Sequence, residues 1–440
     1  MKKLIALLLT VVLMFSLAAC GSKKDDGADP TKTPTTKPTD SASEEKVTLN
    51  VWHQWSNDTN ELKKSYDAAV AEYEATHKNI KINTETLDTE AYKTKIAAEF
   101  AGKASGIDVF YYWGAGTAKK LVDAGKLLPI DQYLTDEVKG KITGSTNAFT
   151  YEGKTYSAPM FSWYMTMYCN KALFDKAGAK IPTTYEELLA ACDKLSKLDG
   201  VTPIAAGAKD GWNAAFIYQA LALREVGGEK INVMLRGETP FGAEGYKEAA
   251  DKVVELYKAK AFGNNPLEIG NDDANSQFIT GKAAIRIMGS WFANQVYTDD
   301  TATVDPSTVV ACKIPMITGK GNDTDYCGGF IESFWVNKEC KYPAEAAEFA
   351  IYMNEKMGKT AYETGTGFSG WKGDFDESKL NPLFIQIKDL VNAGKTSVLA
   401  WDTSLESEPA TVHNEQVQTL FAPGADTNEF IEEQAAVINK

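Results

Sequence analysis

Residues 47–58, with the sequence VTLNVWHQWSND, begin as a strand and end in two tryptophans. Apolar and polar residues alternate from Val47 to Val51, which is typical of a strand with one buried face. Trp52 and Trp55 then stand where the strand ends, although such places usually carry small polar residues. The sequence therefore predicts a strand that delivers large aromatic rings to the edge of a sheet.

Strand and helix patterns alternate along the rest of the chain. A helix is expected over 62–77, a strand over 80–87, a helix over 92–105 and a strand over 106–116. Short links between alternating strands and helices indicate a parallel sheet with right-handed crossovers. Later strands are expected over 201–208, 282–291, 309–317, 331–338 and 396–401, and later helices over 183–198, 213–228, 244–260 and 344–358. This order favours an α/β protein with two lobes over one large sheet.

The N-terminus has the features of an export signal. Residues 1–19 combine a basic start with an apolar run that is short for a membrane span, as in a signal peptide. The small residues before Cys20 resemble the bacterial lipoprotein processing site, so Cys20 is expected to be lipidated, with palmitate as an acyl group. A plain secretory leader is the alternative. Residues 20–46 contain no large apolar side chain and are expected to form a disordered tether.

Composition excludes several classes of function. The net charge is −14, and it becomes −16 once Lys2 and Lys3 leave with the leader, so nucleic acid and anionic membrane surfaces are poor partners. The three histidines have no metal-ligand spacing and no CxxC motif occurs, so neither a metal nor a cofactor is expected. Cys312 and Cys327 could form a disulfide, or all five cysteines after Cys20 could be free thiols.

Aromatic residues recur at the ends of predicted strands. In open parallel sheets, ligands bind at the carboxyl ends of the strands. If two sheets face each other, these rings line one cleft, and flat apolar faces suit the C–H faces of pyranose rings. Trp335 lies inside an apolar strand and is expected in the core, whereas Trp52 could line the cleft or pack in the core. The rings that follow predicted strands are Trp55, Tyr112, Trp113, Trp212, Trp291 and Trp401.

Acidic residues near these rings could accept hydrogen bonds from sugar hydroxyl groups. Ser290 precedes Trp291 and is expected to cap the next helix, which would fix the indole at the cleft wall. The acidic candidates are Asp58, Glu85, Asp210, Glu332, Asp402 and Glu406.

Three segments carry a resemblance to a known family. Residues 156–188, 277–292 and 327–353 read YSAPMFSWYMTMYCNKALFDKAGAKIPTTYEEL, QFITGKAAIRIMGSWF and CGGFIESFWVNKECKYPAEAAEFAIYM. They are similar to conserved blocks of the extracellular solute-binding proteins of carbohydrate ABC transporters, the maltose-binding-like family 1. One departure is Trp163 with its two preceding residues, where many members carry Asp or Asn.

The resemblance implies a fold and a site. Two lobes, each a mostly parallel sheet flanked by helices, would close over a sugar in a cleft at the hinge. The N-lobe would comprise 47–156 and 313–355, and the C-lobe 157–312 and 356–440. Trp291 corresponds to the tryptophan that stacks on a sugar ring in the family, and Tyr164, Phe330 and Trp371 fall in segments that often line the cleft.

A function follows from the resemblance. The protein would be a monomeric receptor, anchored only by its lipid on the outer face of the bacterial cytoplasmic membrane. It would bind a carbohydrate, most simply an oligosaccharide, and deliver it to the permease subunits of an ABC transporter. It would not be an enzyme.

Two alternatives stay open on the sequence. A surface glycoside hydrolase also uses aromatic subsites, but it needs a positioned pair of carboxylates, and no hydrolase motif is present. A receptor of the same fold could bind a peptide, a polyamine, a phosphate ester or a metal. A phosphate ester would favour an arginine clamp, and the chain has only Arg224, Arg236 and Arg286.

Overall fold

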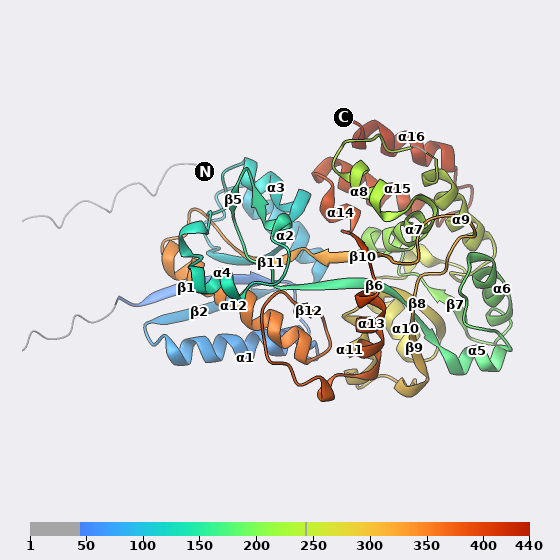
Figure 1. The fold of residues 1–440 in the computed structure, drawn as a ribbon, viewed down its shortest axis with the longest axis horizontal. Helices are drawn as coiled ribbons and strands as arrows, with labels where there is room; N and C mark the ends of the chain where they lie inside the picture. The colour runs from blue at the N-terminus through green and yellow to red at the C-terminus, as the bar shows by residue number, and fades with distance from the viewer. Residues whose placement is uncertain (1–44, 243) are drawn as a thin grey trace, which may run out of the picture. The chain divides into compact units, whose positions relative to one another are not determined.

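The computed structural model describes residues 45–242 and 244–440, which contain two main β-sheets flanked by helices (Figure 1). The expected leader, Cys20 and the tether up to residue 44 lie outside the described residues. Within the described residues, no helix is long and apolar enough to cross a membrane.

The first sheet forms the N-lobe and has the strand order β11-β3-β1-β2. Its central strand, β1, pairs in parallel with β2 and β3, whereas β11 pairs antiparallel with β3. The strands are β1 (Val47–His53), β2 (Ile80–Thr86), β3 (Val109–Trp113) and β11 (Glu332–Val336). The helices of this lobe are α1 (Glu61–Thr76), α2 (Thr89–Ala101), α3 (Ala115–Asp123), α4 (Asp136–Lys141) and α12 (Pro343–Glu363). The strand–helix alternation predicted for the first seventy residues of the folded part is confirmed.

The second sheet forms the C-lobe and has the order β13-β10-β6-β8-β7, with β12 and β9 also paired to β6. Its strands are β6 (Phe161–Asn170), β7 (Thr202–Ala205), β8 (Ala283–Gly289), β9 (Val309–Cys312), β10 (Asp325–Phe330), β12 (Phe368–Ser369) and β13 (Thr396–Val398). The sequence predicted a mostly parallel sheet, but this sheet is mixed. The long strand β6 runs antiparallel to its neighbours β8, β9, β10 and β12.

Helices surround the second sheet and supply much of the C-lobe core. They are α5 (Lys171–Ala177), α6 (Tyr185–Leu195), α7 (Gly211–Val226), α8 (Gly228–Leu235), α9 (Tyr246–Lys258), α10 (Asn271–Ile279), α11 (Phe292–Thr298), α13 (Pro382–Asn392), α14 (Trp401–Ser404), α15 (Ser407–Thr419) and α16 (Thr427–Ile438). A small hairpin of β4 (Thr150–Tyr151) and β5 (Lys154–Thr155) completes the described strands. Helix α6 begins with a capping box formed by Thr184 and Glu187.

The chain crosses between the two sheets at Ile331, where β10 of the second sheet ends and β11 of the first begins. A neighbouring segment crosses before β6, and the Met160 backbone N–H donates to the Glu332 carbonyl at 3.3 Å. Gly328 lets β10 lie close against β6: its φ is +139°, and a Cβ there would lie 2.0 Å from the Trp163 carbonyl oxygen. Strand β10 belongs to the second sheet, whereas β11 belongs to the first.

The core residues agree in part with expectation. Trp335 is fully buried in β11, and its indole N–H donates to the Tyr112 carbonyl at 3.1 Å, so the prediction of a core residue is confirmed. Trp52 is nearly buried, with the Lys95 ammonium 4.5 Å from its ring centroid, and it does not line the cleft described below. Cys312 and Cys327, whose pairing the sequence left open, are both free thiols.

Candidate ligand-binding cleft

A cavity of about 630 Å³ lies between side chains of the two lobes. Trp55 follows β1 and Trp113 ends β3 on the N-lobe wall, while Trp163 of β6 and Trp212 of α7 stand on the C-lobe wall. The ends of β1 and β3 and the beginnings of β6 and α7 thus meet at one place, as expected for a ligand site in an α/β fold. A volume of this size suits a small-molecule ligand.

The C-lobe wall is an aromatic cluster. Trp163 and Phe216 are stacked with ring centroids 5.4 Å apart, and Trp291 meets Trp163 edge to face at 5.0 Å. Trp212 contacts Phe216 at 5.2 Å. These four rings support one another, so each presents its remaining face to the cavity in a fixed orientation.

Trp291 is held against the backbone of β8. A Cβ atom at Gly289 would lie 2.0 Å from atom Cζ3 of the Trp291 ring, so the glycine is what lets the indole lie this close. The predicted cap at Ser290 is wrong by one residue: Trp291 itself is the N-cap of α11, without a side-chain hydrogen bond. Ser290 is buried, and its hydroxyl accepts from the Tyr164 N–H at 3.4 Å.

The N-lobe wall also presents rings, and a cation bridges the two walls. Trp55, Tyr112 and Trp113 line the N-lobe side. The Lys93 ammonium lies 5.5 Å from the Trp113 centroid and 5.7 Å from that of Trp212, so it contacts one ring from each lobe. Side chains of the two lobes therefore face each other across a short gap.

Two carboxyl groups in the cleft have raised pKa values. Burial raises the pKa of Glu332 to about 7, while the nearby Tyr111 hydroxyl and Trp113 indole N–H act in the opposite direction. Burial also raises the pKa of Asp402, and the positive charge of Lys93 opposes this shift. Glu332 can therefore accept or donate a hydrogen bond near neutral pH, depending on its protonation.

Three buried polar atoms in the cleft have no hydrogen-bond partner among the described residues: Gln54 Oε1, Trp163 Nε1 and Asn414 Oδ1. Buried polar atoms are normally paired, because leaving one unpaired costs about 1–3 kcal/mol. The Trp163 N–H lies close enough to Glu332 to favour the ionised carboxylate, but it is not in hydrogen-bond geometry. These atoms mark places where a ligand with hydroxyl groups would complete the hydrogen bonding.

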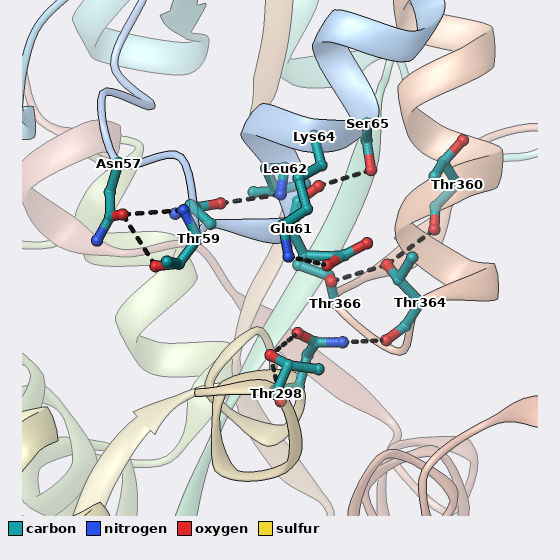
Figure 2. A network of polar contacts seen from close by, with 12 residues as sticks. Asn57, Thr59, Glu61, Leu62, Lys64, Ser65, Thr298, Thr360, Thr364 and Thr366 are labelled. Carbon is teal, nitrogen blue, oxygen red and sulfur yellow. Dashed lines mark hydrogen bonds and ion pairs between the residues drawn. The ribbon is translucent and has the colours of Figure 1, made fainter. Parts of the chain in front are cut away.

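Small polar side chains form one edge of the cleft (Figure 2). On the α1 side, Asn57 Oδ1 accepts from the Thr59 N–H and hydroxyl, both at 2.9 Å. On the opposite side, the Asn294 amide donates to the Thr364 carbonyl at 2.7 Å and accepts from the Thr298 hydroxyl at 2.9 Å. This edge offers hydroxyl and amide groups, with the carboxylate of Glu61 beside them.

Eight of the residues proposed from the sequence line this cleft. They are Trp55, Tyr112, Trp113, Trp163, Trp212, Trp291, Glu332 and Asp402. Five others lie outside it, namely Asp58, Tyr164, Phe330, Trp371 and Trp401, and three further acidic candidates are described below.

The five residues outside this cleft have identifiable surroundings. Trp371 is 1% exposed, and its indole N–H donates to the Pro159 carbonyl at 2.7 Å. Trp401 is equally buried, among Tyr218, Tyr246 and His413. Both rings pack in the core; Trp401 follows a strand as expected, but the end of a strand does not determine which way the next side chain points.

The other three lie at the surface or near the lobe crossing. Asp58 is exposed and pairs with Lys63 at 3.5 Å. Tyr164 packs edge to face on Phe368, and the Phe330 ring lies over Gly144 near the crossing segment.

The other acidic candidates are also engaged elsewhere. Glu85 pairs with Lys95, and Glu406 lies 3.7 Å from the Lys119 ammonium. Asp210 accepts from the Asn271 backbone N–H at 2.7 Å. No group of three or more His, Cys, Asp or Glu side chains within 45–242 and 244–440 could hold a metal ion.

Several cleft residues could not be found from the sequence. Asn271 and Asn275 on α10 and Gln295 and Asp299 around α11 line the C-lobe wall. They follow no strand, and their amides resemble ordinary surface residues in the sequence. The tryptophans were a usable signal because large rings are rare at strand ends.

Fold and cleft together define a class of protein: a two-lobed binding protein that holds a small ligand between its lobes. The chain belongs to the bacterial extracellular solute-binding protein family, which matches it over residues 56–360. Members of this family are binding receptors.

Individual relatives agree with this assignment. An uncharacterized ABC transporter extracellular-binding protein of Pyrococcus horikoshii is 26% identical over 431 residues, covering 96% of this chain and 94% of the relative. A probable sugar-binding periplasmic protein of Rhizobium meliloti is 35% identical over 149 residues, or 32% of this chain and 34% of the relative. A structure from work on xylan utilization by the thermophilic bacterium Caldanaerobius polysaccharolyticus is 34% identical, with a TM-score of 0.84 over 89% of this chain and all of that one. The two-lobed α/β fold expected from the sequence is confirmed.

Proposed function

We propose that this protein is the carbohydrate receptor of an ABC transporter and that its ligand is a neutral oligosaccharide derived from xylan. The observation that carries the proposal is the cleft itself, in which aromatic rings on both walls accompany buried polar atoms that have no partner among residues 45–242 and 244–440. Sugars have apolar C–H faces and many hydroxyl groups, so they satisfy both features. The similarity to the protein from the xylan study supports a xylan-derived sugar as the ligand.

We also propose boundaries for the two lobes and a lipid anchor at Cys20. The N-lobe would comprise 47–156 and 331–363, because β11 and α12 pack with the first sheet. The remainder would form the C-lobe. Cys20 would carry the lipid that holds a monomeric receptor on the outer face of the cytoplasmic membrane, where it meets the permease. Cys20→Ser should release the protein from the membrane and leave sugar affinity unchanged.

A thermal-shift screen tests the ligand class. Xylotetraose should raise the melting temperature, since a ligand that binds only the native state adds about 2.7 kcal/mol of stability at a hundredfold excess over its Kd. Cellotetraose, maltotetraose and chitotetraose, together with spermidine and a tetrapeptide, complete the panel. A shift with spermidine or the peptide, and none with any sugar, would overturn the proposal.

One observation favours a second function strongly enough to be tested. A carboxyl group with a pKa of about 7 in an aromatic cleft, such as Glu332, resembles the general acid of a glycoside hydrolase. The receptor proposal predicts that no reducing ends appear when xylotetraose is incubated with the protein. Their appearance at a rate that Glu332→Gln abolishes would identify an enzyme.

A further inference from the structure

Arg286 is fully buried behind the C-lobe wall of the cleft, in the middle of β8. Its guanidinium donates to Asn275 Oδ1 at 3.0 Å, to Asn213 Oδ1 at 2.9 Å and to Asn271 Oδ1 at 3.0 Å. It also donates to the Ala205 carbonyl at 3.0 Å. In the described part of the chain its acceptors are neutral oxygens, which is unusual for a buried positive charge.

These bonds fix the orientation of three amide groups. An asparagine side chain can place either its oxygen or its NH₂ group toward a neighbour. Because the guanidinium only donates, the oxygens of Asn213, Asn271 and Asn275 must all face it. The NH₂ groups of the two cleft-lining residues, Asn271 and Asn275, must then point away from Arg286.

The orientation of these amides determines the direction of the next hydrogen bonds along the cleft wall. The Asn275 amide donates to Gln295 Oε1 at 3.3 Å, and the Gln295 amide then donates to Asp299 Oδ2 at 3.3 Å. Asn271 Nδ2 donates to Asp272 Oδ1 at 2.9 Å. Every bond in these chains runs in one direction, from the guanidinium toward a carboxylate.

On this wall, the hydrogen-bonding groups that these amides leave unused within the described part of the chain are N–H groups. Asn271, Asn275 and Gln295 each have two amide N–H bonds, of which one is used as described. Within the described residues, the second N–H of each has no protein acceptor, and all three side chains line the cleft. This wall therefore offers a row of donors to whatever the cleft holds.

We propose that Arg286 is a positioning residue for the ligand site, which orients the amides of Asn271, Asn275 and Gln295 so that their free N–H groups meet oxygen acceptors of the ligand. In an oligosaccharide, the ring and glycosidic oxygens accept hydrogen bonds and cannot donate them. The donor row suits this edge of the sugar chain, whereas the aromatic cluster suits its apolar faces. This inference rests on the proposed function for the identity of the ligand.

Asn275→Asp tests the donor row with little change of shape. The new carboxylate still accepts from Arg286, so the melting temperature should stay within a few degrees, but acceptors replace the NH₂ group. Calorimetric titration with xylotetraose should show affinity lowered by about tenfold or more. Asn83→Asp adds the same charge on an exposed side chain of β2 outside the cleft and should leave affinity unchanged. Equal affinities of Asn275→Asp and Asn83→Asp would overturn the proposal.

Arg286→Lys tests whether the arginine acts through Asn275. Lysine keeps the charge but lacks the planar fork that reaches several acceptors. Affinity should fall, and adding Asn275→Asp should lower it little further, because both changes remove the same orientation. Additive losses would show that Arg286 only supports the fold. If Arg286→Lys does not fold, the comparison of Asn275→Asp with Asn83→Asp decides alone.

The proposed ligand and the positioning role of Arg286 can be disproved separately. If wild-type protein does not bind xylotetraose, the proposed ligand is wrong, and the positioning role is then tested without ligand. The amide hydrogens of Asn275 and Gln295 that bond to Gln295 Oε1 and Asp299 Oδ2 should exchange with solvent more slowly in the wild type than in Arg286→Lys. Unchanged exchange rates would overturn the positioning role.

Discussion

Tryptophan serves two purposes in this chain, and sequence position does not separate them. Trp291 and Trp401 both follow predicted strands, yet Trp291 lines the cleft and Trp401 is packed in the C-lobe core. The difference lies in their neighbours: Gly289 lets the Trp291 ring fold over β8, whereas Trp401 lies among rings from α7, α9 and α15. Sequence reasoning could locate the rings but not the direction in which each one points.

Replacing Trp291 with alanine should weaken sugar binding by about tenfold to a hundredfold. Burying a large apolar side chain contributes roughly 1.5–3 kcal/mol, and each ~1.4 kcal/mol is a factor of ten in affinity. Calorimetric titration of the variant measures this loss. Trp401→Phe is the control, because it should lower the melting temperature and leave affinity unchanged. Wild-type affinity in Trp291→Ala would remove this residue from the site.

Glu332→Gln should stabilise the protein at pH 8 and have little effect at pH 5. Burial raises the pKa of Glu332 to about 7 from an ordinary value of 4.5, so the folded state holds this proton more tightly than the unfolded state. The resulting stability is complete below pH 4.5 and is lost as the pH rises through 7. Glutamine is never charged, so the gain at pH 8 should be on the order of 1–3 kcal/mol. Urea melts at both pH values measure it, and an equal change at the two would contradict the raised pKa.

At the scale of helices and strands, most elements were predictable, including the fully buried strands β3 and β8. The elements from β1 to β3 carry clear strand or helix patterns, and they occur where expected. Strand β6 was not expected, because its ten residues show no alternation and polar side chains interrupt its apolar run. Helix α10 was also not expected, so the amide wall built on it could not be inferred from the sequence.

The link between β8 and α11 depends on one glycine. Gly289→Ala would place a methyl group 2.0 Å from the Trp291 ring, so the indole must shift. We expect a stability loss of about 1–3 kcal/mol and weaker sugar binding. Gly140→Ala in α4 is the matched control, because a Cβ there meets nothing within 4 Å, and it should be neutral or slightly stabilising. Denaturant melts with a sugar titration of both variants check this, and equal behaviour would contradict the close packing.

At the scale of the whole molecule, the cleft is covered by contacts between the lobes. The Thr117 hydroxyl at the start of α3 donates to the Thr403 carbonyl at 3.3 Å, and Lys93 contacts a ring from each lobe. Trp163 is only 4% exposed. Because these contacts join the two walls directly, we expect this arrangement to be the closed one and the free protein also to populate an open one.

Small-angle X-ray scattering of the protein with and without xylotetraose tests most directly whether a sugar is held between the lobes. Ligand contacts on both walls are gained only in the closed arrangement, so binding should shift the population toward it. The radius of gyration should be smaller at saturating xylotetraose than in the free protein. Spermidine at the same concentration should leave the radius unchanged. A radius that does not change when xylotetraose is shown by calorimetry to be bound would contradict binding between the lobes.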